Sequence, residues 1–513
     1  ISAACKLGYT QKHRSYIRNM LPAITKPIKQ LSSHAGIILA SSGAASLLLY
    51  TRFLQFNLNT FSEKPLQSLQ LLLHNDKAAA LSLMAVLLGL VVLYGIGYWA
   101  VLHLSKRTAW LLVIGWAASF AAVLLFMYPF AAADIWDYIM HARIFGVYGD
   151  NPFVDLVKEY PKDPFYDYAF WKDLASTYGP AWVLVTGLAA RLAGDGITTN
   201  VIIFKMVPGV FFFGSLWIVA QTLRRTAPER MLPAVFLMAW NPMVLFETFG
   251  NGHNDMSMVF WILLAVLCLV RKQYVFTILS LIMGALFKFI PLILLPAAGL
   301  ICLRDIAGLK DRLRYMLVSA LLSVCLIAAV YAPFWHGWDT LTVLGRSDLF
   351  RSSLAAILYA GLGKTIDKAM LSQALVLLVN GLLLAYVAWA SWQALKDKTW
   401  LSFPTAAVRI LLFYLLVSCT WMMVWYPIWP LALAVLLPPG ALQGLAVFFS
   451  LTVLSKQFFL FPVFWWGKKL TAFQVDLSLF LLLVFPSWLY VLAIYGKSLA
   501  HKTRATLVKK PSP

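Results

Sequence analysis

The sequence predicts an all-α polytopic membrane protein, and three observations support this fold class. Of its 513 residues, 61% are hydrophobic and only 12% are charged, whereas an ordinary soluble domain carries about a quarter charged residues. The mean hydropathy is +0.77. Apolar runs such as residues 78–102 are long enough to cross a hydrocarbon core about 30 Å thick and alternate too little for barrel strands. This composition argues against a soluble enzyme, a nucleic-acid-binding protein and a disordered scaffold.

About fourteen membrane-crossing helices are expected, with amphipathic helices in the outer loops. Basic turns set their direction, because Lys and Arg concentrate on the cytoplasmic side. The run 274–302 is interrupted from Lys288 to Pro291, so it counts as two short helices that meet near the outer face. The expected spans are 31–54, 78–103, 109–130, 200–223, 231–249, 255–270, the two halves of 274–302, 314–332, 370–395, 405–424, 427–439, 441–461 and 473–496.

Two long segments are expected on the outer side. The segment 131–199 contains the largest concentration of acidic residues in the protein. Within it, residues 180–193 are apolar but too short to span, so we expect an amphipathic helix lying on the outer surface. A second outer loop, 333–370, carries Arg346 and Arg351 among apolar residues, which suggests interfacial helices that roof a cavity.

Both ends of the sequence are basic, within a net charge of +21, and neither residues 1–30 nor 497–513 contain an acid. The positive-inside rule therefore places both termini in the cytoplasm. A cleaved signal peptide is not expected, because the first apolar segment has its small residues in the middle. Aromatic or Gly-rich RNA-binding patterns are missing, so no nucleic-acid partner is expected. The expected division is a tail (1–30), two N-terminal helices (31–108), a main membrane module (109–439, with its outer loop 131–199), C-terminal helices (440–496) and a tail (497–513).

Asp134 and Asp137 lie where a helix is expected to emerge at the outer interface, beside Trp136 and Tyr138. A carboxylate that is partly desolvated there can accept a proton from a hydroxyl nucleophile. Acids at a helix end are often only solvated caps. The pair, flanked by aromatic residues suited to the headgroup level, favours a functional role.

A polar turn, Asn251-Gly252-His253-Asn254-Asp255, separates two expected helices. Asn-Gly is a common turn, but His253 and Asp255 add groups that a turn does not need. Asp255 is either the N-cap of the following helix or a catalytic or substrate-binding group. The sequence leaves both alternatives open.

Cations on the outer side are the minority in this topology and need a reason. Lys288 lies between Phe287 and Phe289, where an unpaired charge is costly, so it is either functional or reaches the interface with its side chain. Five outer cations can hold a phosphate next to lipid: Lys288, Arg143, Arg346, Arg351 and Lys172. Binding of lipid headgroups is the alternative for each of them.

In their order and spacing, these residues resemble the GT-C superfamily of polytopic glycosyltransferases. The likeness is closest to bacterial polyprenyl-phosphate-mannose-dependent α-mannosyltransferases, and fainter to the mannosyltransferase of GPI-anchor synthesis. It covers about residues 110–430 and leaves the first two and last two helices unmatched. Four patterns carry it: Asp134 to Tyr138 followed by Gly149 to Phe153, then Tyr178-Gly179-Pro180, then His253-Asn254-Asp255, then Lys288 with Pro291.

The resemblance implies an enzyme that moves a hexose, mannose, from a polyprenyl-phosphate donor to a lipid-linked or glycan acceptor at the outer face of a bacterial plasma membrane. By position, the implied base is Asp134, with Asp137 the second candidate. Single displacement with inversion is expected. No cofactor is expected, because the phosphate leaving group is already stable, although Asp134, Asp137 and Asp255 can in principle meet around a divalent ion. The implied ligands of the donor phosphate or sugar are Arg143, Tyr178, His253, Asn254, Asp255, Lys288, Arg346 and Arg351.

Two other functions fit parts of the sequence. A lipid or solute transporter would also have many helices and a broken one, but its charges should lie near mid-membrane rather than in outer loops. A non-catalytic assembly subunit would not need the Asp134, His253-Asn254-Asp255 and Lys288 clusters together. The glycosyltransferase remains the favoured hypothesis.

Overall fold

The computed structural model describes residues 34–61, 76–104, 107–130, 133–341, 349–456, 470–494 and 496. Regular structure in these ranges is helical, and the only β pairing is in isolated bridges such as that between Arg351 and Trp421. The predicted all-α membrane fold is therefore confirmed. Both basic tails and Arg346 lie outside the described residues.

Six helices of the described residues are long and apolar enough to cross a membrane, or eight if two bent pairs each count as one span. The bent pairs are Pro228–Ala239 with Pro242–Gly250, at 52°, and Ala472–Leu483 with Phe485–Ile494, at 41°. The expected number of about fourteen is not confirmed, because several predicted spans are helices of only 10–17 residues. The long helices are α2 (Ala35–Thr51, continued by η1, Arg52–Phe56), α5 (Lys77–Leu102), α6 (Arg107–Leu125), α9 (Ile197–Thr226), α15 (Leu309–Tyr331) and α17 (Lys368–Lys396).

Shorter helices build the rest of the bundle. The predicted break in 274–302 is present, because α13 ends at Phe287 and η6 starts at Ile290. The α-helices are α3 (Leu58–Phe61), α7 (Asp134–Arg143), α8 (Pro180–Ala193), α10 (Met231–Ala239), α11 (Pro242–Leu245), α12 (Asp255–Val270), α13 (Tyr274–Phe287), α14 (Leu295–Asp305), α16 (Leu354–Leu362), α18 (Ser402–Phe413), α19 (Ile428–Ala434), α20 (Ala441–Thr452) and α22 (Ala472–Leu483). The 3-10 and π turns are η2 (Ile144–Tyr148), η3 (Val157–Glu159), η4 (Pro228–Arg230), η5 (Phe246–Gly250), η6 (Ile290–Leu294), η7 (Ala332–Phe334), η9 (Tyr414–Ser418) and η10 (Val453–Ser455).

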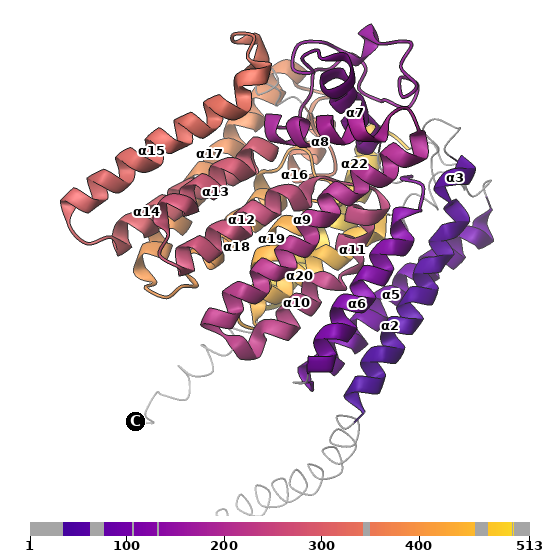
Figure 1. Ribbon diagram of the computed structural model, residues 1–513, viewed down its shortest axis with the longest axis horizontal. Coiled ribbons are helices and arrows are strands. Elements are labelled where there is room, and N and C mark those ends of the chain that lie inside the picture. Colours follow the sequence, from indigo (N-terminus) through magenta and orange to yellow (C-terminus); the bar gives the residue numbers. More distant parts are fainter. Residues whose placement is uncertain are drawn as a thin grey trace, which may run out of the picture.

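Figure 1 shows α2, α5 and α6 packed together on one side of the bundle and α13, α14, α15 and α17 on the opposite side. Helices α9 and α12 lie side by side between them. The predicted amphipathic helix is present as α8, which packs against α7. Its buried face includes Trp182 and its exposed face includes Leu188 and Leu192. An apolar exposed face suits contact with lipid.

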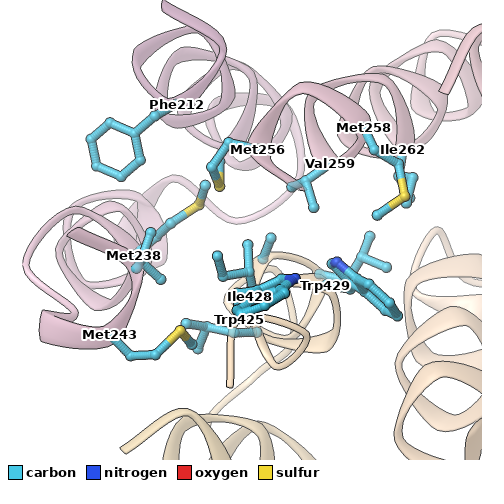
Figure 2. Close-up of a cluster of buried hydrophobic side chains, with 14 of the residues drawn as sticks. Phe212, Met238, Met243, Met256, Met258, Val259, Ile262, Trp425, Ile428 and Trp429 are labelled. Atoms are coloured by element: carbon cyan, nitrogen blue, oxygen red, sulfur yellow. The ribbon is translucent and has the colours of Figure 1, made fainter. Parts of the chain in front are cut away.

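The centre of the bundle is an apolar core in which methionine and tryptophan side chains meet. Figure 2 shows Met238, Met243 and Met256 gathered around Trp425, with Trp429 on the side of Met258. All of these side chains are buried. Flexible thioethers fill the irregular space beside the large indole rings, so the segment that carries Trp425 and Trp429 is packed against the apolar core.

Candidate active site

Four segments that are far apart in the sequence meet at one end of the bundle. They are the start of α7, the turn between η5 and α12, the break after α13, and residues 421–429. Asp255 Oδ1 accepts hydrogen bonds from Lys288 Nζ at 2.8 Å and from Trp429 Nε1 at 2.5 Å. Nδ1 of His253 lies 3.8 Å from Oδ2 of Asp134. The structure therefore brings Asp134, His253, Asp255 and Lys288 together.

The turn that presents His253 has a tightly constrained backbone. The chain leaves α11 through the π turn η5, a feature that often occurs at functional sites, and the His253 amide donates to the Glu247 carbonyl at 2.9 Å. Gly252 has φ +77°, and a Cβ there would lie 2.6 Å from Ile135 Cδ1 and 3.2 Å from Lys205 Cγ. Only glycine suits this position, so the turn fits closely against α7 and α9.

His253 is fully buried and lies between two carboxylates. Its Nε2 is 3.2 Å from Oε2 of Glu247, on the opposite side of the ring from Asp134. The ring stacks on Trp425 with centroids 3.6 Å apart and an interplanar angle of 21°. Neither ring nitrogen makes a hydrogen bond with good geometry to the described residues. The imidazole is thus held in place by stacking and charge.

Asp255 is the first residue of α12, and its carboxylate does not cap that helix. The N-cap residue is Asn254, whose side chain makes no capping bond. The Asp255 carboxylate binds Lys288 instead, so the capping alternative for Asp255 is wrong. Tyr138 Oη donates to Asn254 Oδ1 at 3.4 Å, which ties the same turn to α7.

Lys288 is the extended residue that ends α13, with φ −160° and ψ 128°. Its ammonium lies 5.1 Å from the ring centroid of Tyr426 and 5.3 Å from that of Trp429, a geometry that stabilises a cation. The side chain keeps 20% of its surface exposed. An ammonium has three donors, so Lys288 can bind Asp255 and still donate to a ligand.

The Tyr178-Gly179-Pro180 pattern packs directly against the Lys288 break. The Gly179 amide donates to the Phe287 carbonyl at 3.1 Å. A Cβ on Gly179 would lie 2.0 Å from the Leu286 carbonyl oxygen, so the approach requires glycine. The adjacent Tyr178 ring meets Tyr138 edge to face, at 4.4 Å between centroids. The pattern therefore positions both the break and an aromatic wall beside Asp134.

Asp134 and Asp137 occupy different environments, although both are on the first turn of α7. Asp134 keeps 24% of its side chain exposed and faces His253. Asp137 is fully buried, and its Oδ1 accepts the amides of Phe170 and Trp171 at 3.0 Å each. Burial raises the pKa of Asp134, an effect that the charges of His253 and Lys288 oppose. Burial raises the pKa of Asp137 to about 7. Its two hydrogen bonds from backbone amides anchor the loop that contains Phe170 and Trp171.

Arg143 does not lie with this group, and each of its three guanidinium nitrogens donates a hydrogen bond elsewhere. It lies nine residues after Asp134, about 14 Å along the helix axis. It donates to Asp163 at 2.7 Å, to Asp195 at 2.7 Å and to the Gly194 carbonyl at 2.9 Å. The structure therefore does not bring Arg143 together with Lys288, and binding of the donor phosphate by Arg143 stays a prediction. In the described residues Arg143 connects parts of the segment 131–199.

Arg351 lies at the rim of the site. Its backbone pairs with Thr420 and Met422, and its Nε is 4.0 Å from Oδ1 of Asp476. Its guanidinium interacts electrostatically with Lys456. The prediction for Arg346 concerns a residue outside the described ranges.

Two residues near the site were missed by the sequence analysis. Glu247 and Lys456 each lie within an apolar run that was treated only as a span, 231–249 and 441–461. Lys456 interacts electrostatically with both Glu247 and Asp134. The missed signal was the charge itself, because ionisable residues inside apolar segments are functional candidates by default.

The three acids that were considered as a metal site do not converge. Asp137 points into the loop, whereas Asp255 is bound to Lys288. In the ranges that the structure describes, no three His, Cys, Asp or Glu side chains form a group able to hold a metal ion. That the reaction needs no metal stays a prediction from the sequence.

The fold and this cluster of charges and aromatic rings define a polytopic membrane protein with a candidate active site at one end of its helix bundle. Comparison with known sequences specifies its family. The chain belongs to the alpha-(1->6)-mannopyranosyltransferase family, because the model of that family's N-terminal domain matches residues 40–304. The match includes most of α2 and all of α5, which the resemblance had left unmatched, and it contains Asp134, Glu247, His253 and Lys288.

Two curated relatives agree with this family. The chain is 21% identical over 208 residues to alpha-(1->6)-mannopyranosyltransferase A of Corynebacterium glutamicum, covering 40% of each chain. It is 26% identical over 172 residues to the protein of the same name from Mycobacterium tuberculosis, covering 32% of each chain. The matched region thus spans less than half the length of the curated relatives.

Proposed function

We propose that the protein is a membrane α-mannosyltransferase that moves a mannosyl group from a polyprenyl-phosphate donor to a glycan or glycolipid acceptor. Family membership and the activity for which the relatives are named support the sugar and the reaction class. The positive-inside reading supports a site on the outer face of a bacterial plasma membrane with both termini in the cytoplasm.

One observation carries the proposal: a half-buried carboxylate and a half-buried ammonium lie in one site although their residues are 154 positions apart, at 134 and 288. The positive charge of Lys288 acts on Asp134 directly. A base and an anion-binding cation at one location are what glycosyl transfer from a lipid phosphate requires.

In the proposed reaction, Asp134 accepts the proton of the acceptor hydroxyl as its oxygen attacks the anomeric carbon. The bond from that carbon to the phosphate oxygen breaks, and the electron pair leaves with the phosphate. Lys288 stabilises the departing charge with the donors that Asp255 does not use. A single displacement of this kind inverts the anomeric carbon. The rings of Tyr178, Tyr426 and Trp429 provide apolar faces for a sugar or an isoprenoid chain.

The test is transfer of radiolabelled mannose from synthetic polyprenyl-phosphate-mannose to membrane acceptors by the purified protein. Asp134→Asn is expected to lower transfer by about 10²–10⁴-fold, the range for loss of a general base, while donor binding is kept. Asp137→Asn is the matched control, because it makes the same substitution on the same helix turn, and transfer should stay within about tenfold. A chelator in one arm tests the expectation that no metal is needed.

Equal transfer by wild type and Asp134→Asn would remove Asp134 from the base role. No transfer from any polyprenyl-phosphate sugar, together with movement of the lipid across liposomes, would instead support a flippase. Retention at the anomeric carbon of the product would contradict the single displacement.

A further inference from the structure

Glu247 is a buried carboxylate that the proposed reaction does not use. It lies in the π turn η5 with 2% of its side chain exposed. Its Oε2 accepts a hydrogen bond from Asn251 Nδ2 at 2.9 Å and lies 3.2 Å from His253 Nε2. Burying a carboxylate costs free energy unless the group is paired. Glu247 therefore needs a partner that offsets this cost.

The geometry makes His253 that partner and connects it to Asp134. The two ring nitrogens face two different carboxylates, at 3.2 Å and 3.8 Å. Stacking on Trp425 prevents the ring from turning away from either one. Each of the two carboxylates attracts a proton that the ring carries, because opposite charges within about 4 Å attract more strongly in a site shielded from water than in water itself.

Other charges face the same group from every element around it. Lys456 follows η10, Lys288 follows α13, and Arg351 lies at the rim. Lys205 on α9 lies behind Gly252, and its ammonium donates to the carbonyls of Leu124, Leu125 and Met127 at the end of α6. The further titratable groups are Asp137, Tyr138, Tyr178, Asp255 and Tyr426.

We propose that Glu247 is a positioning residue: it holds His253 as an imidazolium beside Asp134, so that the Asp134 carboxylate stays ionised and ready to accept a proton. This inference rests on the proposed role of Asp134 as the base. The Glu247–His253 pair has no net charge, but its positive end faces Asp134. It therefore opposes the burial that would otherwise protonate Asp134.

The first experiment follows the protonation of Asp134 without requiring turnover. The infrared band of the protonated carboxyl is titrated against pH, and Asp134 is assigned as the band that is lost in Asp134→Asn. Glu247→Gln is expected to move the Asp134 midpoint upward by about 1 pH unit, because the neighbouring cation is lost. His253→Gln should move it at least as far, since Glu247 is then left unpaired.

Two variants separate charge from structure. Asn251→Ala removes a hydrogen bond to Glu247 but keeps all charges, so the midpoint should not move. Lys456→Gln removes the other cation near Glu247 and should have a smaller effect than Glu247→Gln. A midpoint that is unchanged or lowered in Glu247→Gln overturns the proposal. An equal shift in Asn251→Ala, or a larger one in Lys456→Gln, overturns it as well.

The second experiment is the pH profile of mannosyl transfer. The acid limb of kcat/KM should move upward in Glu247→Gln by the same amount as the infrared midpoint, with kcat recovered at high pH. Glu247→Asp, which keeps the charge, should lie between wild type and Glu247→Gln. If the wild type transfers no sugar, the proposed function fails, and the infrared titration still decides whether Glu247 controls Asp134.

Discussion

The two ends of α7 carry two ionic clusters that differ in how completely their polar atoms are paired. At the C-terminal end, Arg143 is 2% exposed and is bound by Asp163, Asp195 and a carbonyl oxygen. At the N-terminal end, neither ring nitrogen of His253 is hydrogen-bonded to a described residue, and Oδ2 of Asp255 is also unsatisfied. Each cluster contains a fully buried ion pair member, Asp163 in one and Asp255 in the other. What distinguishes the candidate site from the structural cluster here is the presence of buried polar atoms without a hydrogen bond to the described residues.

The largest expected effect on stability comes from disrupting the cluster of Arg143, Asp163 and Asp195, which we call the saturated cluster. Arg143→Met leaves Asp163 buried without its cation, so the free energy of unfolding should fall by about 3–5 kcal/mol. Thermal unfolding in detergent and the folded yield measure this loss. Asp195→Asn is the matched control, because Asp195 is 79% exposed, and it should cost less than about 1 kcal/mol.

Arg143→Met also tests whether the Arg143 cluster is structural and separate from the site. Transfer per folded molecule should stay within about threefold of wild type in Arg143→Met, far less than the loss of a group that stabilises the transition state. Unchanged stability with a loss of donor binding would place Arg143 in the site after all.

The next largest effect, on transfer, is expected at the cluster around His253 and Asp255, which we call the unsaturated cluster. Lys288→Gln removes the cation that faces both Asp255 and Asp134, and transfer should fall by about 10²–10³-fold, as for loss of one group that stabilises a departing charge. Lys288→Arg keeps the charge and should recover part of the activity. Lys172→Gln is the control, because Lys172 lies over the ring of Tyr166 and near Asp167 and not with Asp255 and Asp134. A similar decrease in both Gln variants would show that general positive charge, not the site, matters.

The sequence predicted the elements that have local causes. Pro291 and Lys288 in an apolar run mark the break after α13, and the polar turn 251–255 marks the start of α12. Apolar length alone gave the boundaries of α5, α9 and α17 to within a few residues. These features depend on neighbours in the chain, so a sequence displays them.

Pairing at long range could not be predicted in the same way. Arg143 was taken for a phosphate ligand because its partners follow 20 and 52 residues later, and no sequence pattern connects them. Glu247 was missed for a different reason. It is the one charged residue in an apolar run that was interpreted only as a membrane span. Charge in a sequence shows that a partner is needed, but only the fold shows whether the partner is protein or ligand.

A smaller effect is expected from two glycines near the two ends of α7. Gly252→Ala places a Cβ 2.6 Å from Ile135 at positive φ, so both strain and displacement of the His253 turn are expected, and transfer should fall at least about tenfold, the effect of a loss of 1.4 kcal/mol. Gly149 also has positive φ, +82°, but a Cβ there meets nothing within 4 Å. Gly149→Ala should therefore lower stability by about 1 kcal/mol through backbone strain alone. Equal transfer by the two variants would mean that the turn is not tightly fitted to α7.

The smallest effect is expected at Asp137, which lies between the two clusters. Burial raises its pKa to about 7, so between pH 4 and pH 7 the folded protein holds a proton that the unfolded chain has released. The stabilisation is therefore complete at low pH and declines as the pH rises toward 7. Asp137→Asn keeps an oxygen to accept the amides of Phe170 and Trp171, so at pH 4 it should differ from wild type by less than about 1 kcal/mol.

The variant should lack the wild-type decline, so unfolding temperatures of the two proteins should diverge from pH 4 to pH 7, with Asp137→Asn the more stable at the upper end. Parallel curves would mean that Asp137 is ionised in the folded protein. An ionised Asp137 would need a cation that neither cluster now supplies to it. Asp137 and the loop that it anchors would then belong to the cluster at the N-terminal end of α7, in which polar atoms lack hydrogen bonds.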